Sequence, residues 1–142
     1  MIIAVDFDGT IVEHKYPKIG KEIPFAIATL KKLQQDGHKL ILWSCREGEL
    51  LQEAVDFCRQ RGVEFFAVNS NYPDENVDAS AIRSRKLKAD MFIDDRNVGG
   101  LPDWGVIYEM ISRRQSYEEY LREMGGNVTA SPKKGVLKRI FG

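Results

Sequence analysis

The sequence is poor in the residues that soft-metal and redox sites use. It contains two cysteines, Cys45 and Cys58, and two histidines, His14 and His38, among 142 residues. The cysteines form no C-x-x-C pair and the histidines share no ligand spacing, so neither a zinc site nor a dithiol redox centre is indicated. Two thiols in a chain this poor in cysteine suit a reducing compartment. We therefore expect both to be free structural thiols and the protein to be cytoplasmic.

The chain also lacks an excess of charge and any long apolar run. Its 21 basic and 21 acidic side chains cancel, so no overall positive field attracts nucleic acid or an anionic membrane. The apolar runs are a handful of residues long, too short to cross a bilayer, and the first residues predict a strand rather than a signal peptide. We expect no nucleic-acid partner, no membrane association and a single domain.

Short apolar runs alternate along the chain with amphipathic segments. The runs predict strands at 2–5, 39–44, 64–69 and 89–95. Apolar residues at helical spacing, with glycines or capping residues at the ends, predict helices from Pro24 to Gly37 and at 48–62, 78–84, 106–111 and 116–125. This alternation predicts an α/β fold with an open, doubly wound, mostly parallel sheet. We expect the domain to cover residues 1–125 and a tail to cover 126–142.

Every predicted strand is followed by, or ends in, a polar side chain. In chain order these are Asp6 and Asp8, then Ser44, then Asn69, then Asp94 and Asp95. Ligands of doubly wound sheets bind at the carboxyl ends of the strands, so we expect these side chains to line one site. Because side chains alternate along an extended chain, the side chains of Asp6 and Asp8 point to the same side. At about 4 Å and an effective dielectric near 20 they repel by roughly 4 kcal/mol, which a cation, a proton or solvent must offset.

A site built from carboxylates favours phosphoryl chemistry with a hard cation. Oxygen ligands suit Mg²⁺ rather than Zn²⁺, and Mg²⁺ commonly bridges carboxylates to phosphate oxygens. One carboxylate can attack phosphorus while a second transfers the proton. Ser44 can hydrogen-bond a phosphoryl oxygen. A basic residue ahead of the fourth strand (Arg85, Lys86 or Lys88) can neutralise charge in the transition state.

The segment Asp6-Phe7-Asp8-Gly9-Thr10, placed directly after an apolar strand, resembles motif I of the haloacid dehalogenase (HAD) superfamily. The other motifs of that superfamily have counterparts here in the same order. Ser44 closes the second strand as motif II does, and a basic residue precedes the fourth strand as in motif III. Asp94 and Asp95 close that strand like the paired aspartates of motif IV. The resemblance covers residues 1 to about 112.

This resemblance implies a role for each aspartate. Asp6 is then the nucleophile and a direct Mg²⁺ ligand. Asp8 is the general acid and base, and its backbone carbonyl is a further Mg²⁺ ligand. Asp94 is another protein ligand, and Asp95 binds the metal through water or orients the site.

The resemblance also suggests roles for residues around the aspartates. We prefer Lys86 as the motif III base, with Lys88 as the alternative. Gly9 allows a sharp departure from the strand, and Thr10 can hydrogen-bond within the loop. Together with Arg46, which follows motif II, these two residues are candidate substrate contacts.

The resemblance implies a Mg²⁺-dependent phosphohydrolase that cleaves a phosphomonoester through an aspartyl-phosphate intermediate. The superfamily's cap positions hold about a dozen residues after motif I and residues 70–85, too few for a cap domain. We expect an open site for a phosphorylated small molecule or a larger phosphorylated substrate, or a homo-oligomer in which a neighbour supplies the lid. Alternatives are a phosphotransferase or nucleotidase using the same site, or a non-catalytic phosphate-binding or receiver-like signalling domain. The receiver alternative is disfavoured because Asn69, and not an aspartate, ends the third strand.

Overall fold

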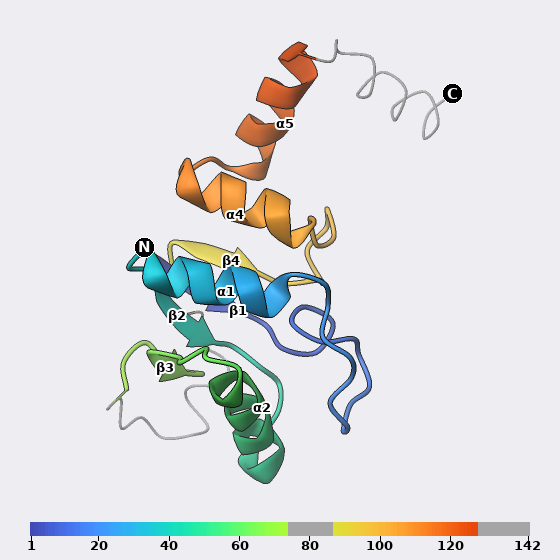
Figure 1. Ribbon diagram of the computed structural model, residues 1–142, viewed down its shortest axis with the longest axis vertical. Coiled ribbons are helices and arrows are strands. Elements are labelled where there is room, and N and C mark those ends of the chain that lie inside the picture. Colours follow the sequence, from blue (N-terminus) through green and yellow to red (C-terminus); the bar gives the residue numbers. More distant parts are fainter. Residues whose placement is uncertain (74–86, 128–142) are drawn as a thin grey trace. The chain divides into compact units, whose positions relative to one another are not determined.

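A computed structural model describes residues 1–73 and 87–127 of the chain. Within these residues the protein is α/β, with four strands and four helices (Figure 1). The strands are β1 (Ile2–Val5), β2 (Lys39–Leu42), β3 (Ala67–Val68) and β4 (Met91–Ile93). They form one sheet in the order β3-β2-β1-β4, and every neighbouring pair is parallel. The predicted α/β class with a parallel sheet is confirmed, and the strand order is compatible with a Rossmann-like fold.

The sheet is buried on both faces. Because side chains alternate across a strand, Ala4, Ile41 and Ala67 share one face, where they pack with Leu87 in an apolar cluster. The opposite face carries further residues with 1% exposure or less: Ile3, Val5, Leu40 and Leu42. Strands buried on both faces explain why the sequence shows continuous apolar runs instead of polar alternation.

Two helices follow β1 and β2 along the chain, α1 (Ala26–Gln35) and α2 (Gly48–Gln60). Gly37 terminates the turn that follows α1, with a φ of 91° that favours glycine, and the His38 N–H donates to the Leu33 carbonyl at 3.1 Å. The predicted start of α1 was too early. Phe25, one of the apolar residues at helical spacing within the predicted helix, precedes α1 with φ 68° and is 68% exposed.

The chain divides into two compact units, Met1–Trp104 and Gly105–Gly142. α4 (Trp104–Ser112) begins at the end of the first unit, and α5 (Tyr117–Asn127) lies in the second. A capping box precedes α5, in agreement with the capping residues expected near position 116. The Ser116 N–H donates to Glu119 Oε2 at 2.7 Å, and the Glu119 N–H donates to Ser116 Oγ at 3.1 Å. α5 extends to Asn127, two residues into the segment expected to be a tail.

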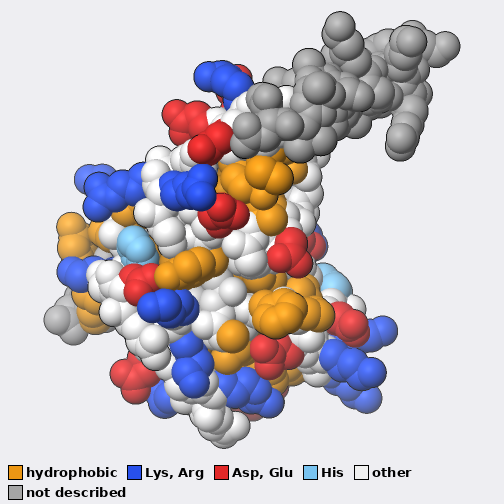
Figure 2. Space-filling model, turned by 45° about the horizontal axis from the view of Figure 1, so that its top comes forward, with side chains coloured by type: hydrophobic (Ala, Val, Ile, Leu, Met, Phe, Trp, Pro, Cys, Tyr) orange, Lys and Arg blue, Asp and Glu red, His pale blue; other side chains and the backbone are white. Residues whose placement is uncertain are grey.

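The second, third and fourth strands are shorter than predicted, because only part of each predicted segment forms strand pairs with a neighbour. β3 pairs with β2 through Ala67 and Val68, and β4 pairs with β1 through Met91–Ile93. The short helix expected at 78–84 lies outside the described residues. Across the described ranges, no helix combines the length and apolar character needed to span a bilayer. Acidic and basic side chains are interspersed on the face drawn in Figure 2, as the balanced composition suggests.

Candidate functional site

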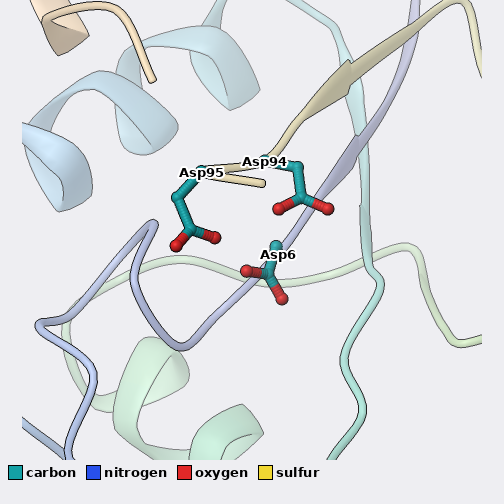
Figure 3. Close-up of side chains that lie close together, drawn as sticks. All are labelled: Asp6, Asp94 and Asp95. Atoms are coloured by element: carbon teal, nitrogen blue, oxygen red, sulfur yellow. The ribbon is translucent and has the colours of Figure 1, made fainter. Parts of the chain in front are cut away.

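Three carboxylates converge at the carboxyl ends of the adjacent strands β1 and β4. Asp6 follows β1, and Asp94 and Asp95 follow β4 (Figure 3). One carboxylate oxygen of each lies within 4.8 Å of the other two. Val5 pairs with Ile93, and the Asp6 N–H donates to the Ile93 carbonyl at 3.0 Å, so Asp6 and Asp94 occupy neighbouring positions. The expectation that these strand ends meet is confirmed for these three residues.

The strand order explains why the acidic cluster forms here. From β1 the chain moves outward to β2 and β3, then returns to β4 on the other side of β1. β1 and β4 are therefore neighbours although they are far apart in the sequence, and the residues that follow them meet at the carboxyl edge of the sheet, the usual ligand position in open α/β sheets. Asp6, Asp94 and Asp95 occupy that position (Figure 3).

The Asp6 carboxyl lies in surroundings that oppose its negative charge. Burial, and then the charge of Asp94, raise its pKa to about 7. Hydrogen bonds from the Phe7 backbone and the Thr10 hydroxyl offset part of this effect. Near neutral pH, Asp6 is therefore a group that a proton or a nearby cation stabilises. This is the electrostatic behaviour expected of a metal-binding carboxylate.

Thr10 forms hydrogen bonds with two members of the acidic cluster, Asp6 and Asp95. Its fully buried hydroxyl lies 3.1 Å from Asp6 Oδ2 and 3.3 Å from Asp95 Oδ1, and it accepts the Asp95 N–H at 3.1 Å. The Thr10 carbonyl accepts the indole N–H of Trp104 at 3.1 Å. These bonds occupy the hydroxyl within the protein, so Thr10 positions two carboxylates and is not placed as the substrate contact we expected.

Gly9 allows Asp95 to approach the loop that leaves β1. Its φ is +86°, and a Cβ atom at this position would lie 2.3 Å from Asp95 Oδ2. The predicted sharp turn is therefore present, and any side chain would collide with the acidic cluster. The Gly9 N–H already donates to the Val12 carbonyl at 2.7 Å. Gly9 therefore shapes the loop, and its contact with substrate stays a prediction.

The Asp8 carboxylate is not a member of the acidic cluster. It forms a bidentate ion pair with Arg46, with Nε 2.7 Å from Oδ2 and Nη2 2.8 Å from Oδ1. The Arg46 side chain is 0% exposed and that of Asp8 is 12% exposed. The hydrogen bond to Asp8 raises the pKa of Arg46 above its ordinary value. Two carboxylates that were expected to face one site therefore have different partners.

The remaining donors of Arg46 also bind within the protein. Nη2 donates to the Lys18 carbonyl at 2.9 Å, and Nη1 donates to the carbonyls of Pro17 at 3.1 Å and Leu50 at 3.5 Å. The guanidinium has five N–H donors, and these five contacts account for all of them. The expectation that Arg46 binds substrate is wrong for this arrangement, because no donor is left for a ligand.

Ser44 occupies the position expected for motif II and is held from both sides. Its N–H donates to Asn69 Oδ1 at 2.8 Å, and its Oγ accepts the Arg46 N–H at 3.1 Å. No acceptor within residues 1–73 and 87–127 binds the hydroxyl proton, so in this part of the chain it is available to donate to a ligand. Asn69 has φ 52°, a conformation that asparagine tolerates better than most residues. Asn69, expected to line the site, therefore orients Ser44.

The basic residue of motif III remains a prediction. Lys86, the preferred candidate, and Arg85 lie outside the described residues. The alternative, Lys88, is exposed, and its backbone N–H donates to Asn71 Oδ1 at 2.7 Å. The choice between Lys86 and Lys88 therefore rests on the sequence alone.

The two cysteines are free, as predicted. Cys58 is fully buried in α2, and burial raises the pKa of its thiol to about 12. A thiol with this pKa is protonated at neutral pH and is a poor nucleophile, which agrees with a structural role. Cys45 is exposed beside Ser44.

Comparisons with known proteins place the chain beside one solved structure. The sequence matches no protein-family model, and a search among curated proteins finds no match. A solved structure described as a conserved protein from Bacteroides thetaiotaomicron is 63% identical, with a TM-score of 0.76. The match covers 84% of this chain and 96% of that one. This chain therefore belongs to the same family as that conserved Bacteroides protein.

Proposed function

We propose that the protein is a Mg²⁺-dependent phosphohydrolase of the HAD superfamily that cleaves a phosphomonoester through an aspartyl phosphate on Asp6. The observation that carries this proposal is the acidic cluster, whose oxygens lie within 4.8 Å of one another at the ends of β1 and β4. The order of the motifs along the chain supports it, from Asp6 and Asp8 through Ser44 to Asp94 and Asp95.

The acidic cluster fits a magnesium ion by both donor chemistry and spacing. Mg²⁺ binds oxygen ligands at about 2.0–2.1 Å in an octahedron, so its ligand oxygens lie no more than about 4 Å apart. Oxygens already within 4.8 Å need only a small adjustment to meet this requirement. Asp6, Asp94 and Asp95 would hold the ion, which when bound neutralises charge on the phosphoryl oxygens.

The side chains then divide the reaction between them. The Asp6 carboxylate attacks phosphorus, and the bond from phosphorus to the leaving oxygen breaks as the new bond forms. Asp8 enters the cycle protonated, gives its proton to that oxygen and becomes the carboxylate that Arg46 holds, then takes a proton from the water that attacks the phosphoenzyme. This second attack releases inorganic phosphate and restores the Asp6 carboxylate. Ser44 donates its hydroxyl proton to a phosphoryl oxygen throughout.

We also propose that the sheet is doubly wound and that the domain has no cap. The order β3-β2-β1-β4 reverses at β1, and right-handed crossovers on either side of a reversal place helices on opposite faces. In the segment between β1 and α1, where one kind of cap would be inserted, Glu13 bonds Lys21 and Ile23 bonds Ile11 through the backbone. A short hydrogen-bonded loop of this kind favours an open site that admits small or larger phosphorylated substrates.

A phosphate-release screen tests the proposal. Phosphorylated metabolites are incubated with the wild-type protein and with Asp6→Asn, in Mg²⁺ and in a chelator. We expect phosphate release that requires Mg²⁺ and is lost in Asp6→Asn. Release should persist in the control Asp56→Asn, because Asp56 lies in α2 with a 45% exposed side chain. Phosphate transferred to an added alcohol would instead indicate a phosphotransferase. A folded protein that binds Mg²⁺ and turns over no substrate in the screen would contradict hydrolysis.

A further inference from the structure

Arg46 is a buried cation for which the motif pattern of the HAD superfamily offered only a substrate contact. Its side chain is 0% exposed. A charge withdrawn from water in this way persists only where the protein supplies matching partners. Here they are the Asp8 carboxylate and three main-chain carbonyls, those of Pro17, Lys18 and Leu50.

Aromatic rings also restrict the guanidinium. Its central carbon lies 5.2 Å from the ring centroid of Phe7 and 5.3 Å from that of Tyr16. Both distances are within the range of cation–π attraction. Phe7 is itself held edge-on by Phe57 of α2, with ring centroids 5.8 Å apart. The guanidinium therefore has little freedom to turn away from Asp8.

Two of the carbonyls that Arg46 binds belong to the loop at residues 13–22, which we call the flap loop. Its base is closed by the Glu13 N–H, which donates to the Lys21 carbonyl at 2.7 Å. Gly20 permits this closure, because a Cβ atom there would lie 2.1 Å from the Glu13 carbonyl oxygen. Arg46 holds the middle of the flap loop through the carbonyls of Pro17 and Lys18.

We propose that Arg46 is a positioning residue that fixes the Asp8 carboxylate and the middle of the flap loop in one arrangement, as proton transfer by Asp8 requires. The same residue helps to orient Ser44, through its backbone N–H. This inference rests on the proposed function, because it gives Asp8 the proton-transfer role. The role assigned to Arg46 is then to support the catalytic side chain of Asp8, and not to contact the substrate.

Arg46→Lys tests this role because lysine keeps the charge and loses the geometry. A single ammonium group cannot make the parallel pair of bonds to Asp8 and also reach both carbonyls of the flap loop. Misplacing a catalytic group by about 1 Å costs on the order of 10²-fold in rate. The loss falls on the step that depends on Asp8, while attack by Asp6 on a substrate with a good leaving group continues.

The kinetic experiment uses an aryl phosphate, whose phenolate departs without a proton. With Arg46→Lys we expect a burst of phenolate near one equivalent and a steady state slowed 10- to 100-fold, as for Asp8→Asn. The double variant should be no slower than Asp8→Asn alone, because both changes disable one unit. Arg59→Lys, on the exposed surface of α2, is the control and should match the wild type. Burst and steady state that fall by the same factor, or multiplicative losses in the double variant, would overturn the proposal.

Amide hydrogen exchange gives a readout that needs no activity. In Arg46→Lys, exchange should rise at least 10-fold in the flap loop, while β1 and β2 keep the protection of the wild type. If Arg46→Lys does not fold, Asp8→Asn removes the ion pair with little change of shape and should produce the same local rise. Unchanged protection of the flap loop in the folded variants would overturn the proposal. If the wild type shows no phosphatase activity but the exchange pattern holds, the proposed function fails and the positioning of Asp8 stands.

Discussion

Asp6 and Asp8 are two residues apart in the sequence and lie in opposite electrostatic surroundings. Asp6 faces Asp94 and Asp95, and its pKa of about 7 shows that its charge is poorly compensated by the protein alone. Asp8 faces a buried guanidinium that contacts both of its oxygens. The repulsion expected between the two is therefore relieved by Arg46 on one side and by a proton or cation on the other. This separation suits two carboxylates with different roles in one reaction.

The raised pKa of Asp6 predicts how the metal-free protein responds to pH. Between the ordinary value of 3.8 and about 7, the folded state binds a proton that the unfolded chain releases. Stability therefore falls as pH rises through that window and levels off above it. Because Asp6 is partly exposed, we expect a loss on the order of 1–2 kcal/mol.

Urea unfolding in a chelator, from pH 4.5 to 8, measures this loss. The difference between the wild type and Asp6→Asn isolates the contribution of Asp6, since the amide does not titrate in this range. Asp56→Asn should follow the wild type. Parallel profiles for the wild type and Asp6→Asn would show that Asp6 titrates normally.

At the scale of elements, local signals predicted the helices better than the strands. Gly37 marks the end of α1, and Ser116 with Glu119 marks the start of α5, because both features act within one turn of the chain. The length of β3 depends on how far β2 pairs with it, which no local pattern encodes. Phe25 was misassigned because its hydrophobicity fits a buried helix face, whereas its backbone adopts a left-handed turn.

The conformation of Phe25 predicts a stabilising substitution at the start of α1. A bulky residue at φ 68° is strained, at a cost of order 1 kcal/mol or more, and its ring is 68% exposed. Asparagine tolerates this conformation, so Phe25→Asn should stabilise the protein by about 1 kcal/mol in urea unfolding. Phe25→Ala removes the ring and keeps the strain, so it should show no such gain. Equal effects of the two substitutions would contradict strain as the cause.

At the scale of the whole molecule, the strand order determines which parts of the site the sequence can predict. Asp6, Asp94 and Asp95 each follow an apolar strand, and parallel strands end at the same edge, so their convergence was predictable. The pairing of Asp8 with Arg46 was not, because these residues are 38 positions apart and Arg46 lies in a loop. Its partners also include backbone carbonyls, whose positions depend on the folded flap loop.

The acidic cluster predicts a coupling between Mg²⁺ binding and the stability of the whole fold. An ion that binds only the folded site stabilises it by mass action, by about 2.7 kcal/mol at a concentration 100 times the dissociation constant. For a chain of this length, that should raise the melting temperature by several degrees. Removing Asp94 should abolish the response, because the cluster loses a ligand.

The same substitution should have the opposite effect on the metal-free protein. The charge of Asp94 helps to raise the pKa of Asp6, so Asp94→Ala relieves repulsion and should increase the melting temperature in a chelator. A lost Mg²⁺ response together with a higher melting temperature in a chelator distinguishes loss of a metal ligand from general damage to the fold. Asp8→Asn should keep the Mg²⁺ response, because the Asp8 side chain contacts Arg46 and not the acidic cluster, and the backbone carbonyl of residue 8 is unchanged. An Asp94→Ala protein with a normal Mg²⁺ shift, measured by thermal unfolding, would exclude the acidic cluster as the metal site.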